Sequence, residues 1–318
     1  MFQALLNAIA HMTLSPDAQR VFHGRGGLHP GCEQWTLDLY PPVCLLTSYQ
    51  PVSAEALAPI EAALHARWAT LCPGEPLNLV FQHRDEVRAH TELRHGTVSE
   101  PHIVTEQGSR FKVHLLRGFN HGLFLDMAEG RRWVREHVAA HRTAASSSFK
   151  VLNLFAYTCA FSVAALQGGA SQVINVDMAS GALSIGRQNH QLNGLPDGAT
   201  FLAHDIFNSW GKINRLGPYD LVIMDPPAYQ KGSFVAEKDY ARLMRRLPDL
   251  LAPGGHALLC LNSPKLGPDF LMDQMAIEAP GLRWVERLAN PAAFADATPD
   301  RALKVLVYQA PLTAPPCA

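Results

Sequence analysis

The chain has 318 residues, a formal net charge of −1 and a pI near 6.9, so no overall positive field marks it as a nucleic-acid-binding protein. Local basic clusters could still bind nucleic acid. The six cysteines form no CxxC pair and no zinc-like spacing, so we expect no structural metal. Apolar runs are strand-length, and residues 1–12 lack a signal-peptide pattern. We therefore expect a cytoplasmic protein that does not enter a membrane.

Residues 1–94 predict a small α/β domain. The expected elements are an amphipathic helix at the start, strands at 35–39, 43–49 and 77–82, and a helix at 54–69. Ser53 is a suitable N-cap for the second helix. A glycine-rich loop at 24–27 contains Arg25 and could approach a phosphate. Such a loop is more often only a turn, so we assign it no role.

Residues 95–149 predict a hairpin followed by a connecting helix. The expected order is a polar connector at 84–100, a hairpin at 103–106 and 110–115, a helix at 129–141 and a small-residue linker at 143–148.

Residues 150–318 predict a doubly wound α/β sheet of the Rossmann-like kind. Apolar strands at 151–155, 173–177 and 220–224 each deliver a polar group at the carboxyl end, and helix-length segments separate them. The other expected elements are strands at 200–205, 256–261, 284–288 and 302–308, and helices at 160–167, 180–193 and 238–251. We expect the last two strands to pair antiparallel. The prediction is thus a mostly parallel, seven-stranded sheet with an antiparallel C-terminal strand, whose ligands bind beyond the strands' carboxyl ends.

Two acids at predicted strand ends suit an adenosine-type cofactor. Asp177 lies about twenty residues beyond the first strand-to-helix turn, where an acid accepts hydrogen bonds from ribose hydroxyls. Asp205 is placed to accept from an adenine amine. Both could also be ordinary strand-end caps. The first turn, 156–160, lacks the G-x-G-x-x-G pattern that a pyrophosphate requires, which argues against a nicotinamide cofactor. S-adenosylmethionine has no phosphate to hold.

Asp225-Pro226-Pro227-Ala228-Tyr229 carries the sharpest signal in the chain. The prolines fix φ and remove two donors, which leaves a rigid turn that presents the Asp225 carboxylate and the Pro226 carbonyl as acceptors. Such a pair suits the amino or imino edge of a planar base, and Tyr229 can stack on the face of that base. The alternative is a Pro-Pro turn with a purely structural role.

With these residues the chain resembles the class I S-adenosylmethionine-dependent methyltransferases, and within them the 23S ribosomal RNA methyltransferases of the guanine-N7 and cytosine-C5 branches. The resemblance covers about residues 103–308. It rests on Gly122-Leu123-Phe124-Leu125-Asp126, Asn153-Leu154-Phe155-Ala156-Tyr157-Thr158, Val176-Asp177 and Asp225-Pro226-Pro227-x-Tyr229. It implies cofactor contacts at Phe124, Asp126, Asn153, Phe155, Tyr157, Asp177, Asp205 and Asp225.

The chain departs from the family pattern at two places. Cys159 and Ala160 stand where the family usually has two glycines. Met127 and Ala128 stand where a polar residue and an arginine usually follow Asp126, although arginines at 131 and 132 keep the later basic positions. These departures could alter the cofactor geometry or weaken activity.

The loop after the fifth predicted strand bears on the atom that is methylated. Methylation of cytosine C5 requires a thiolate that first adds to the ring, and relatives of that branch carry a cysteine in this loop. Here the loop contains Asn262 and Lys265 but no cysteine, and Cys260 lies within the strand, where we expect it in the core. Asn262 and Lys265 resemble the guanine-N7 branch. We therefore predict methylation at a ring or amino nitrogen.

We predict a methyltransferase that acts on a base of RNA, expected in the large ribosomal subunit. The predicted catalytic residues are Asp225, Pro226 and Tyr229, and Tyr229, Asn262 and Lys265 are the predicted substrate contacts. Two alternatives stay open: methylation of a protein amide or small heteroaromatic compound, and a binding protein that keeps the fold without turnover. The sequence does not decide the target nucleotide, the oligomeric state or the role of residues 1–94.

Overall fold

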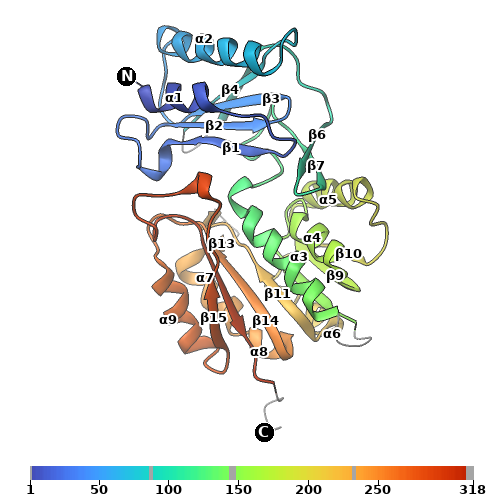
Figure 1. Cartoon of the computed structure of the whole chain (residues 1–318). Coiled ribbons are helices and arrows are strands. Elements are labelled where there is room, and N and C mark those ends of the chain that lie inside the picture. Colours follow the sequence, from blue (N-terminus) through green and yellow to red (C-terminus); the bar gives the residue numbers. More distant parts are fainter. Residues whose placement is uncertain (1, 86–88, 143–147, 231–233, 313–318) are drawn as a thin grey trace. The chain divides into compact units, whose positions relative to one another are not determined.

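The structure is a computed structural model that describes residues 2–85, 89–142, 148–230 and 234–312 (Figure 1). The chain forms two compact units, Met1–Asp126 with Pro291–Pro299 and Met127–Asn290 with Asp300–Ala318. The predicted hairpin thus clusters with the first unit and the predicted connecting helix with the second. The predicted division after residues 94 and 149 stays a prediction. None of the helices in the described ranges is long and apolar enough to cross a bilayer.

A five-stranded sheet in the order β1-β2-β3-β4-β5 forms the centre of the first unit. Its elements are α1 (Gln3–His11), β1 (Gln19–His23), η1 (Gly24–Gly26), β2 (Trp35–Tyr40), β3 (Val43–Ser48), α2 (Ala54–Leu71), β4 (Asn78–Arg84) and β5 (Ala89–His95). The chain continues with β6 (His102–Glu106), β7 (Ser109–Val113) and η2 (Leu125–Met127), and η3 (Ala292–Phe294) returns to this unit. Apolar residues of α1, α2 and the strands form one core. The predicted cap of α2 is confirmed, since Ser53 Oγ accepts from the Ala56 amide at 3.3 Å.

The prediction of a connector throughout 84–100 is wrong, because residues 89–95 form the edge strand β5, which pairs antiparallel with β4. Most β5 side chains are exposed or half-buried. An edge strand with so little buried surface needs no apolar alternation, so its sequence resembles that of a loop.

The second unit contains the predicted seven-stranded sheet. Its elements are α3 (Ala128–Arg142), β8 (Lys150–Leu154), α4 (Ala160–Gly168), β9 (Gln172–Asp177), α5 (Ser180–Leu192), β10 (Ala199–Ala203), α6 (Trp210–Leu216), β11 (Tyr219–Met224), β12 (Tyr229–Gln230), β13 (Phe234–Val235), α7 (Ala236–Met244), α8 (Leu247–Leu250), β14 (Leu251–Leu261), α9 (Pro268–Glu278), β15 (Arg283–Arg287) and β16 (Lys304–Gln309). The strand order is β10-β9-β8-β11-β14-β16-β15. The first five are parallel, and β16 pairs antiparallel with both β14 and β15. The fold prediction is confirmed.

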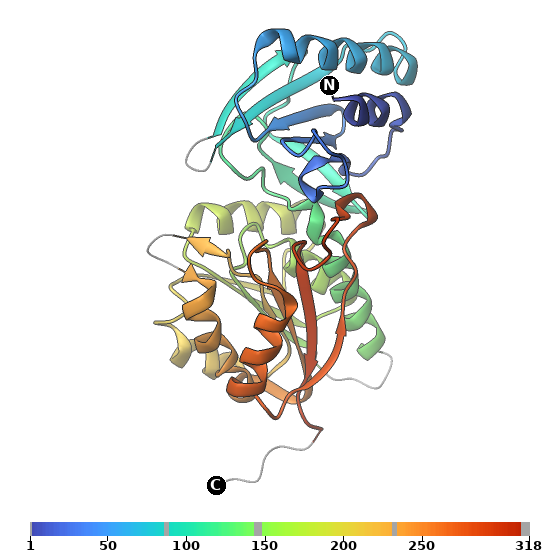
Figure 2. The same ribbon diagram turned by 90° about the vertical axis from the view of Figure 1, so that its left-hand side faces the viewer.

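Helices cover both faces of this sheet (Figure 1). On one face α3 and α4 pack on a core that includes Val138, Phe161, Val151 and Ile223. On the other face, residues of α6, α7, α8 and α9 form a larger core with alternate residues of the same strands. Figure 2 shows the orange α7 and α9 in front of the sheet. Because both faces are buried, the parallel strands are nearly continuous apolar runs, which is why the sequence pattern revealed them.

The prediction of one helix over 238–251 followed by a strand at 256–261 is wrong in its boundaries. The helix is divided into α7 and α8, and β14 already begins at Leu251. The β11–β14 register jumps from Tyr219↔Leu251 to Leu221↔His256, so the intervening residues form a bulge. Gly254 has a φ of 76° in this bulge, and its amide donates to the Pro311 carbonyl at 2.8 Å. Pro253, Gly254 and Gly255 follow the predicted helix, but they form a bulge within the strand rather than the end of a helix.

Buried neutral histidines predict that the protein loses stability in mild acid. Burial is the main cause that lowers the pKa of His23 and His256 to about 4 and that of His137 to about 3. These folded-state values lie below the unfolded value near 6.5, so the unfolded chain takes up more protons once the pH falls below about 6.5. Each group then removes at most about 1.4 kcal/mol per pH unit. Urea unfolding should therefore shift to lower denaturant between about pH 7 and pH 5, and an unchanged midpoint would contradict this assignment.

Candidate active site

The carboxyl ends of four parallel strands bring the predicted acids to one edge of the sheet. Met224 pairs with Leu154, and Leu154 pairs with Val176. The next residues along the three strands, Asp225, Phe155 and Asp177, therefore share one row. Asp177 pairs in turn with Ala203 of β10, two residues before Asp205. Since β8 lies between β9 and β11, this row includes the point where the strand order reverses.

Asp177 is held by two backbone amides. Its Oδ2 accepts from the Tyr157 amide and its Oδ1 from the Ala179 amide, both at 2.8 Å. The first bond ties the turn after β8 to the end of β9. A carboxylate has about four lone-pair sites, so two such bonds leave acceptor capacity for hydroxyl groups of a ligand.

Asp205 follows the same pattern one strand further along the sheet. Oδ1 accepts from the Phe207 amide at 2.8 Å, and Oδ2 accepts from Asn208 Nδ2 at 2.9 Å. The side chain therefore shapes its own loop. It also keeps acceptor capacity at the edge of the sheet where an adenine amine was predicted to bind.

The turn after β8 contains three non-glycine residues in the left-handed region. Phe155, Tyr157 and Cys159 have φ values of 56°, 47° and 61°. Each such residue costs about 1–2 kcal/mol relative to a right-handed conformation, and strain of this kind concentrates at functional sites. Cys159, one of the two departures from the family pattern, thus occupies a position where a glycine would be unstrained.

Cys159 is accommodated by a glycine on the neighbouring helix. A Cβ on Gly186 of α5 would lie 2.5 Å from Cys159 Sγ and 3.0 Å from Cys159 Cβ. The missing side chain at 186 therefore leaves the room that the extra side chain at 159 fills.

A buried network of hydrogen bonds connects α4 and α5 to the sheet. Asn153 Nδ2 donates to Asn175 Oδ1 at 2.9 Å, and Asn175 Nδ2 donates to Ser162 Oγ at 3.0 Å. Ser162 Oγ and His190 Nε2 are 2.9 Å apart, and His190 Nδ1 lies 2.7 Å from the Gly186 carbonyl. Burial lowers the pKa of His190, so a neutral ring donates to the carbonyl and accepts from the serine. Asn153, a predicted cofactor contact, is only 1% exposed and is part of this hydrogen-bond network.

Three aromatic side chains join the loops that follow different strands. Phe234 of β13 lies with its ring centroid 5.2 Å from that of Phe155 and 6.5 Å from that of Phe207. Tyr240 of α7 packs against the same ring at 5.7 Å, and its hydroxyl donates to the Cys260 carbonyl. The sequence pattern predicted no role for Phe207, Phe234 and Tyr240. Aromatic residues shortly after strand ends were the available signal, but their convergence depends on the fold.

The acid–diproline–aromatic segment leaves β11 and leads into a short hairpin. Asp225 is half-buried and Pro226 buried, whereas Tyr229 is 69% exposed. Tyr229 pairs with Val235 in the β12–β13 hairpin, and the Ala236 amide donates to the Ala228 carbonyl at 3.1 Å. Backbone pairing thus holds Tyr229 in place while its ring faces solvent.

The loop after β14 presents Asn262 and Lys265, both exposed, beyond the end of a strand that neighbours β11. Lys304 supports this loop from β16. Its Nζ is fully buried, donates to the Ser263 carbonyl and contacts the Asp300 carbonyl at 3.3 Å. A single lysine in the apolar run 302–308 is the sequence signal for this support, although the sequence pattern alone predicted no role for it. Phe124 and Asp126 belong to the first unit, and their cofactor contacts stay predictions.

Neither cysteine close to these loops suits covalent catalysis. Cys159 is fully buried, and burial together with nearby Asp177 raises the pKa of its thiol. Cys260 is fully buried and belongs to the core beneath α3 and α4, as expected. Cys317 lies outside the described residues.

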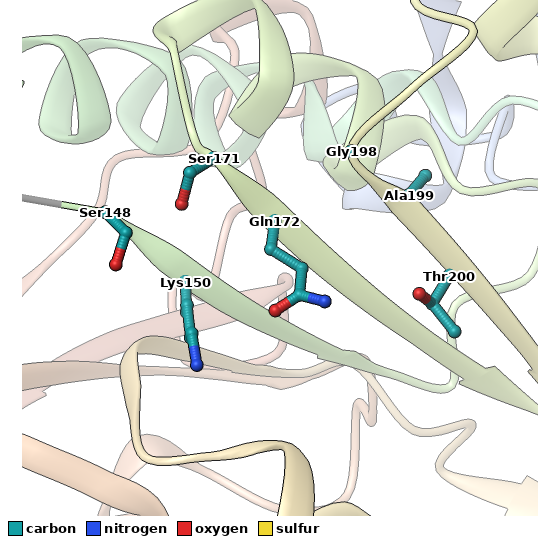
Figure 3. A pocket seen from close by; sticks show the side chains of 7 residues that line it. All are labelled: Ser148, Lys150, Ser171, Gln172, Gly198, Ala199 and Thr200. Carbon is teal, nitrogen blue, oxygen red and sulfur yellow. The ribbon is translucent and has the colours of Figure 1, made fainter.

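A hollow of about 380 Å³ lies at the opposite edge of the sheet (Figure 3). It is lined at the amino ends of β8, β9 and β10 by Ser148, Lys150, Ser171, Gln172, Gly198, Ala199 and Thr200. Gln172 begins β9 and Asp177 ends it, so the strand separates the two edges by about 16 Å. The hollow therefore contains none of the predicted cofactor or catalytic residues, and we assign it no ligand.

The fit between Cys159 and Gly186 predicts a strong coupling between these positions. Gly186→Ala should destabilise the protein by about 1–3 kcal/mol, because the new methyl overlaps the sulfur. In a Cys159→Gly background the same change should be neutral or stabilising by up to about 1 kcal/mol, since alanine favours helix. Urea unfolding of the four proteins gives the coupling energy, and additive effects would contradict the packing.

Comparisons with known proteins identify the family of the chain. A family model described as S-adenosylmethionine-dependent methyltransferase matches residues 19–309. The chain is 33% identical over 211 residues to Ribosomal RNA large subunit methyltransferase I of Aeromonas salmonicida (strain A449), covering 64% of this chain and 51% of that protein. It is 38% identical over 176 residues to Ribosomal RNA large subunit methyltransferase K/L of Psychrobacter sp. (strain PRwf-1), covering 53% of this chain and 21% of that protein. The chain thus spans about half the length, or less, of these relatives.

A solved structure supports the fold. SMU.776, assigned as a methyltransferase and solved in complex with SAH, superposes with a TM-score of 0.77 at 24% identity, covering 96% of this chain and 78% of that chain. The family model over residues 19–309 confirms the predicted resemblance at the level of the family. The chain belongs to the S-adenosylmethionine-dependent methyltransferases.

Proposed function

We propose that the protein transfers a methyl group from S-adenosylmethionine to a nitrogen of an RNA base, in large-subunit ribosomal RNA of the cytoplasm. The single observation that carries the proposal is the row formed by Asp225, Phe155 and Asp177, beside which Tyr229 is held exposed. The names of the curated relatives, ribosomal RNA large subunit methyltransferases, supply the substrate class.

The hydrogen-bond acceptors along this edge of the sheet fit the cofactor. Asp177 and Asp205 offer acceptors for hydroxyl and amino groups, and the strained turn after β8 carries side chains where a phosphate site would carry glycines. We assign Asp177 to the ribose hydroxyls and Asp205 to the adenine amine, with Phe155 and Tyr157 beside them. When bound, S-adenosylmethionine supplies an electrophilic methyl group on a sulfonium sulfur.

Asp225, the Pro226 carbonyl and Tyr229 would orient the base. The two acceptors receive hydrogen bonds from its amino or imino edge, and the Tyr229 ring stacks on its face. Asn262 and Lys265 would contact the same substrate from the loop after β14. These residues position groups rather than move protons, so alignment of the attacking nitrogen would supply most of the rate.

The state of the cysteines favours nitrogen over cytosine C5. Attack on the C5 position needs a thiolate within reach of the ring. Cys159 is buried with a raised pKa, and Cys260 packs in the core. A base nitrogen has its own lone pair and requires no such step.

Label transfer tests the proposal directly. Wild-type protein should move labelled methyl groups from the cofactor into RNA or ribosomes, and Asp225→Ala should lower the rate about 10²-fold through lost alignment. Asp249→Ala, which removes an exposed acid on α8, is the matched control and should keep full activity.

The other outcomes of this experiment are equally informative. Label in a protein or small-molecule fraction would favour methylation of a protein amide or small heteroaromatic compound, which the net charge of −1 also suits. Cofactor binding by calorimetry without label transfer would favour a binding protein. A lack of cofactor binding would end the enzyme proposal.

Tyr229 offers a second test. Loss of a base stack costs about 1–3 kcal/mol, so Tyr229→Ala should lower kcat/KM for RNA about tenfold or more. Tyr229→Phe keeps the ring and should retain nearly full activity. Because the side chain is 69% exposed, both variants should fold. Equal losses in the two variants would indicate that the hydroxyl, and not the ring face, matters.

A further inference from the structure

Three histidines of the second unit lie together far from the candidate active site. His137 and His141 are one turn apart on α3, and His256 is on β14. One ring nitrogen from each residue lies within 4.8 Å of the other two. The proposed methyl transfer uses none of them.

The hydrogen bonds around the cluster leave nitrogen lone pairs available. His141 Nδ1 lies 2.8 Å from the His137 carbonyl, so this nitrogen donates and Nε2 keeps its lone pair. His137 Nε2 is buried and has no hydrogen-bond partner among the described residues. A buried polar atom without a partner costs about 1–3 kcal/mol, and coordination to a cation would satisfy it.

Neighbouring groups hold the rings in place. Trp133 stacks on His137 with ring centroids 4.4 Å apart and planes 12° apart. The indole Nε1 of Trp133 donates to Glu286 at 3.0 Å. The His137 centroid lies 4.3 Å from that of His141 and 4.4 Å from that of His256. A ligand pair spaced by one helical turn is therefore aimed at a ligand on the adjacent strand.

We propose that His137, His141 and His256 form a binding site for a divalent transition-metal ion of the zinc class. Imidazole nitrogens suit Zn²⁺, Cu²⁺ and Ni²⁺, and a zinc–nitrogen bond is about 2.0–2.1 Å long. Ligand nitrogens around a tetrahedral ion are then about 3.4 Å apart. The distances between the ring nitrogens therefore have to shorten by at most about 1.5 Å for an ion to bind. His141 is exposed, which leaves the fourth position open to water.

The location assigns the ion a structural role, which departs from the expectation, based on the cysteine spacing, of no structural metal. His256 pairs with Leu221, four residues before Asp225, so about 13 Å of strand separates it from the row of acids. An ion at this place would fasten the C-terminal half of α3 to the sheet. The nearby charges are Glu286, which holds Trp133, and Arg283, whose guanidinium donates to Gln309 Oε1 at 2.6 Å.

Metal titration tests the site. The protein is the untagged full chain, treated with a chelator that removes bound metal and then freed of the chelator. Calorimetry with Zn²⁺ should show one site per chain, and Co²⁺ should give the absorption bands of a coordinated ion. His141→Gln, a change at an exposed position, should weaken Zn²⁺ binding at least about tenfold and abolish the rise in Tm that the metal causes.

His11→Gln is the matched control. His11 is also exposed near the end of a helix, and its Nδ1 lies 2.8 Å from the carbonyl four residues earlier, as in His141. This variant should bind Zn²⁺ like the wild type. The proposal is overturned if the wild type binds no Zn²⁺ or Co²⁺, if His141→Gln binds as well as the wild type, or if both variants lose affinity equally. Unchanged circular dichroism shows that each variant is folded.

Discussion

The carboxylate of Asp177 is the contact on which the candidate site depends. It joins the amide of Tyr157 in the turn after β8 to the amide of Ala179 at the start of α5. The backbone carbonyl of Asp177 accepts from the His204 amide at 3.1 Å, which aligns the end of β10 as well. One residue thus sets the relative positions of three strand ends. Because a carboxylate accepts several hydrogen bonds, the same side chain can both build the edge and face a ligand.

The strained turn after β8 exists because its surroundings determine it at each position. Phe155 packs on Phe234, Tyr157 is tied through its amide to Asp177, and Cys159 fills the room beside Gly186. Left-handed residues without these contacts would relax at a gain of about 1–2 kcal/mol each. Packing and hydrogen bonding at each of these positions therefore hold the strained turn in one conformation.

Much of the fold was predictable because buried parallel strands have continuous apolar runs in their sequence. The strands at 151–155, 173–177 and 220–224 were found in this way, and so were the acids that follow them. The edge strand β5 was missed because a mostly unburied strand has no such pattern. The bulge at Gly254 was missed because a glycine after a helix has the same local appearance whether it ends the helix or bends a strand.

The sequence by itself determined the class of fold, the acids at the strand ends and the absence of a phosphate-binding turn, since each depends on residues close together in the chain. Only the tertiary structure decided that Asn153 is buried, that Phe155, Phe207 and Phe234 converge, and that His256 joins the histidine pair of α3. Such contacts depend on strand order and register across long separations. Local periodicity carries no information about which strand becomes a neighbour.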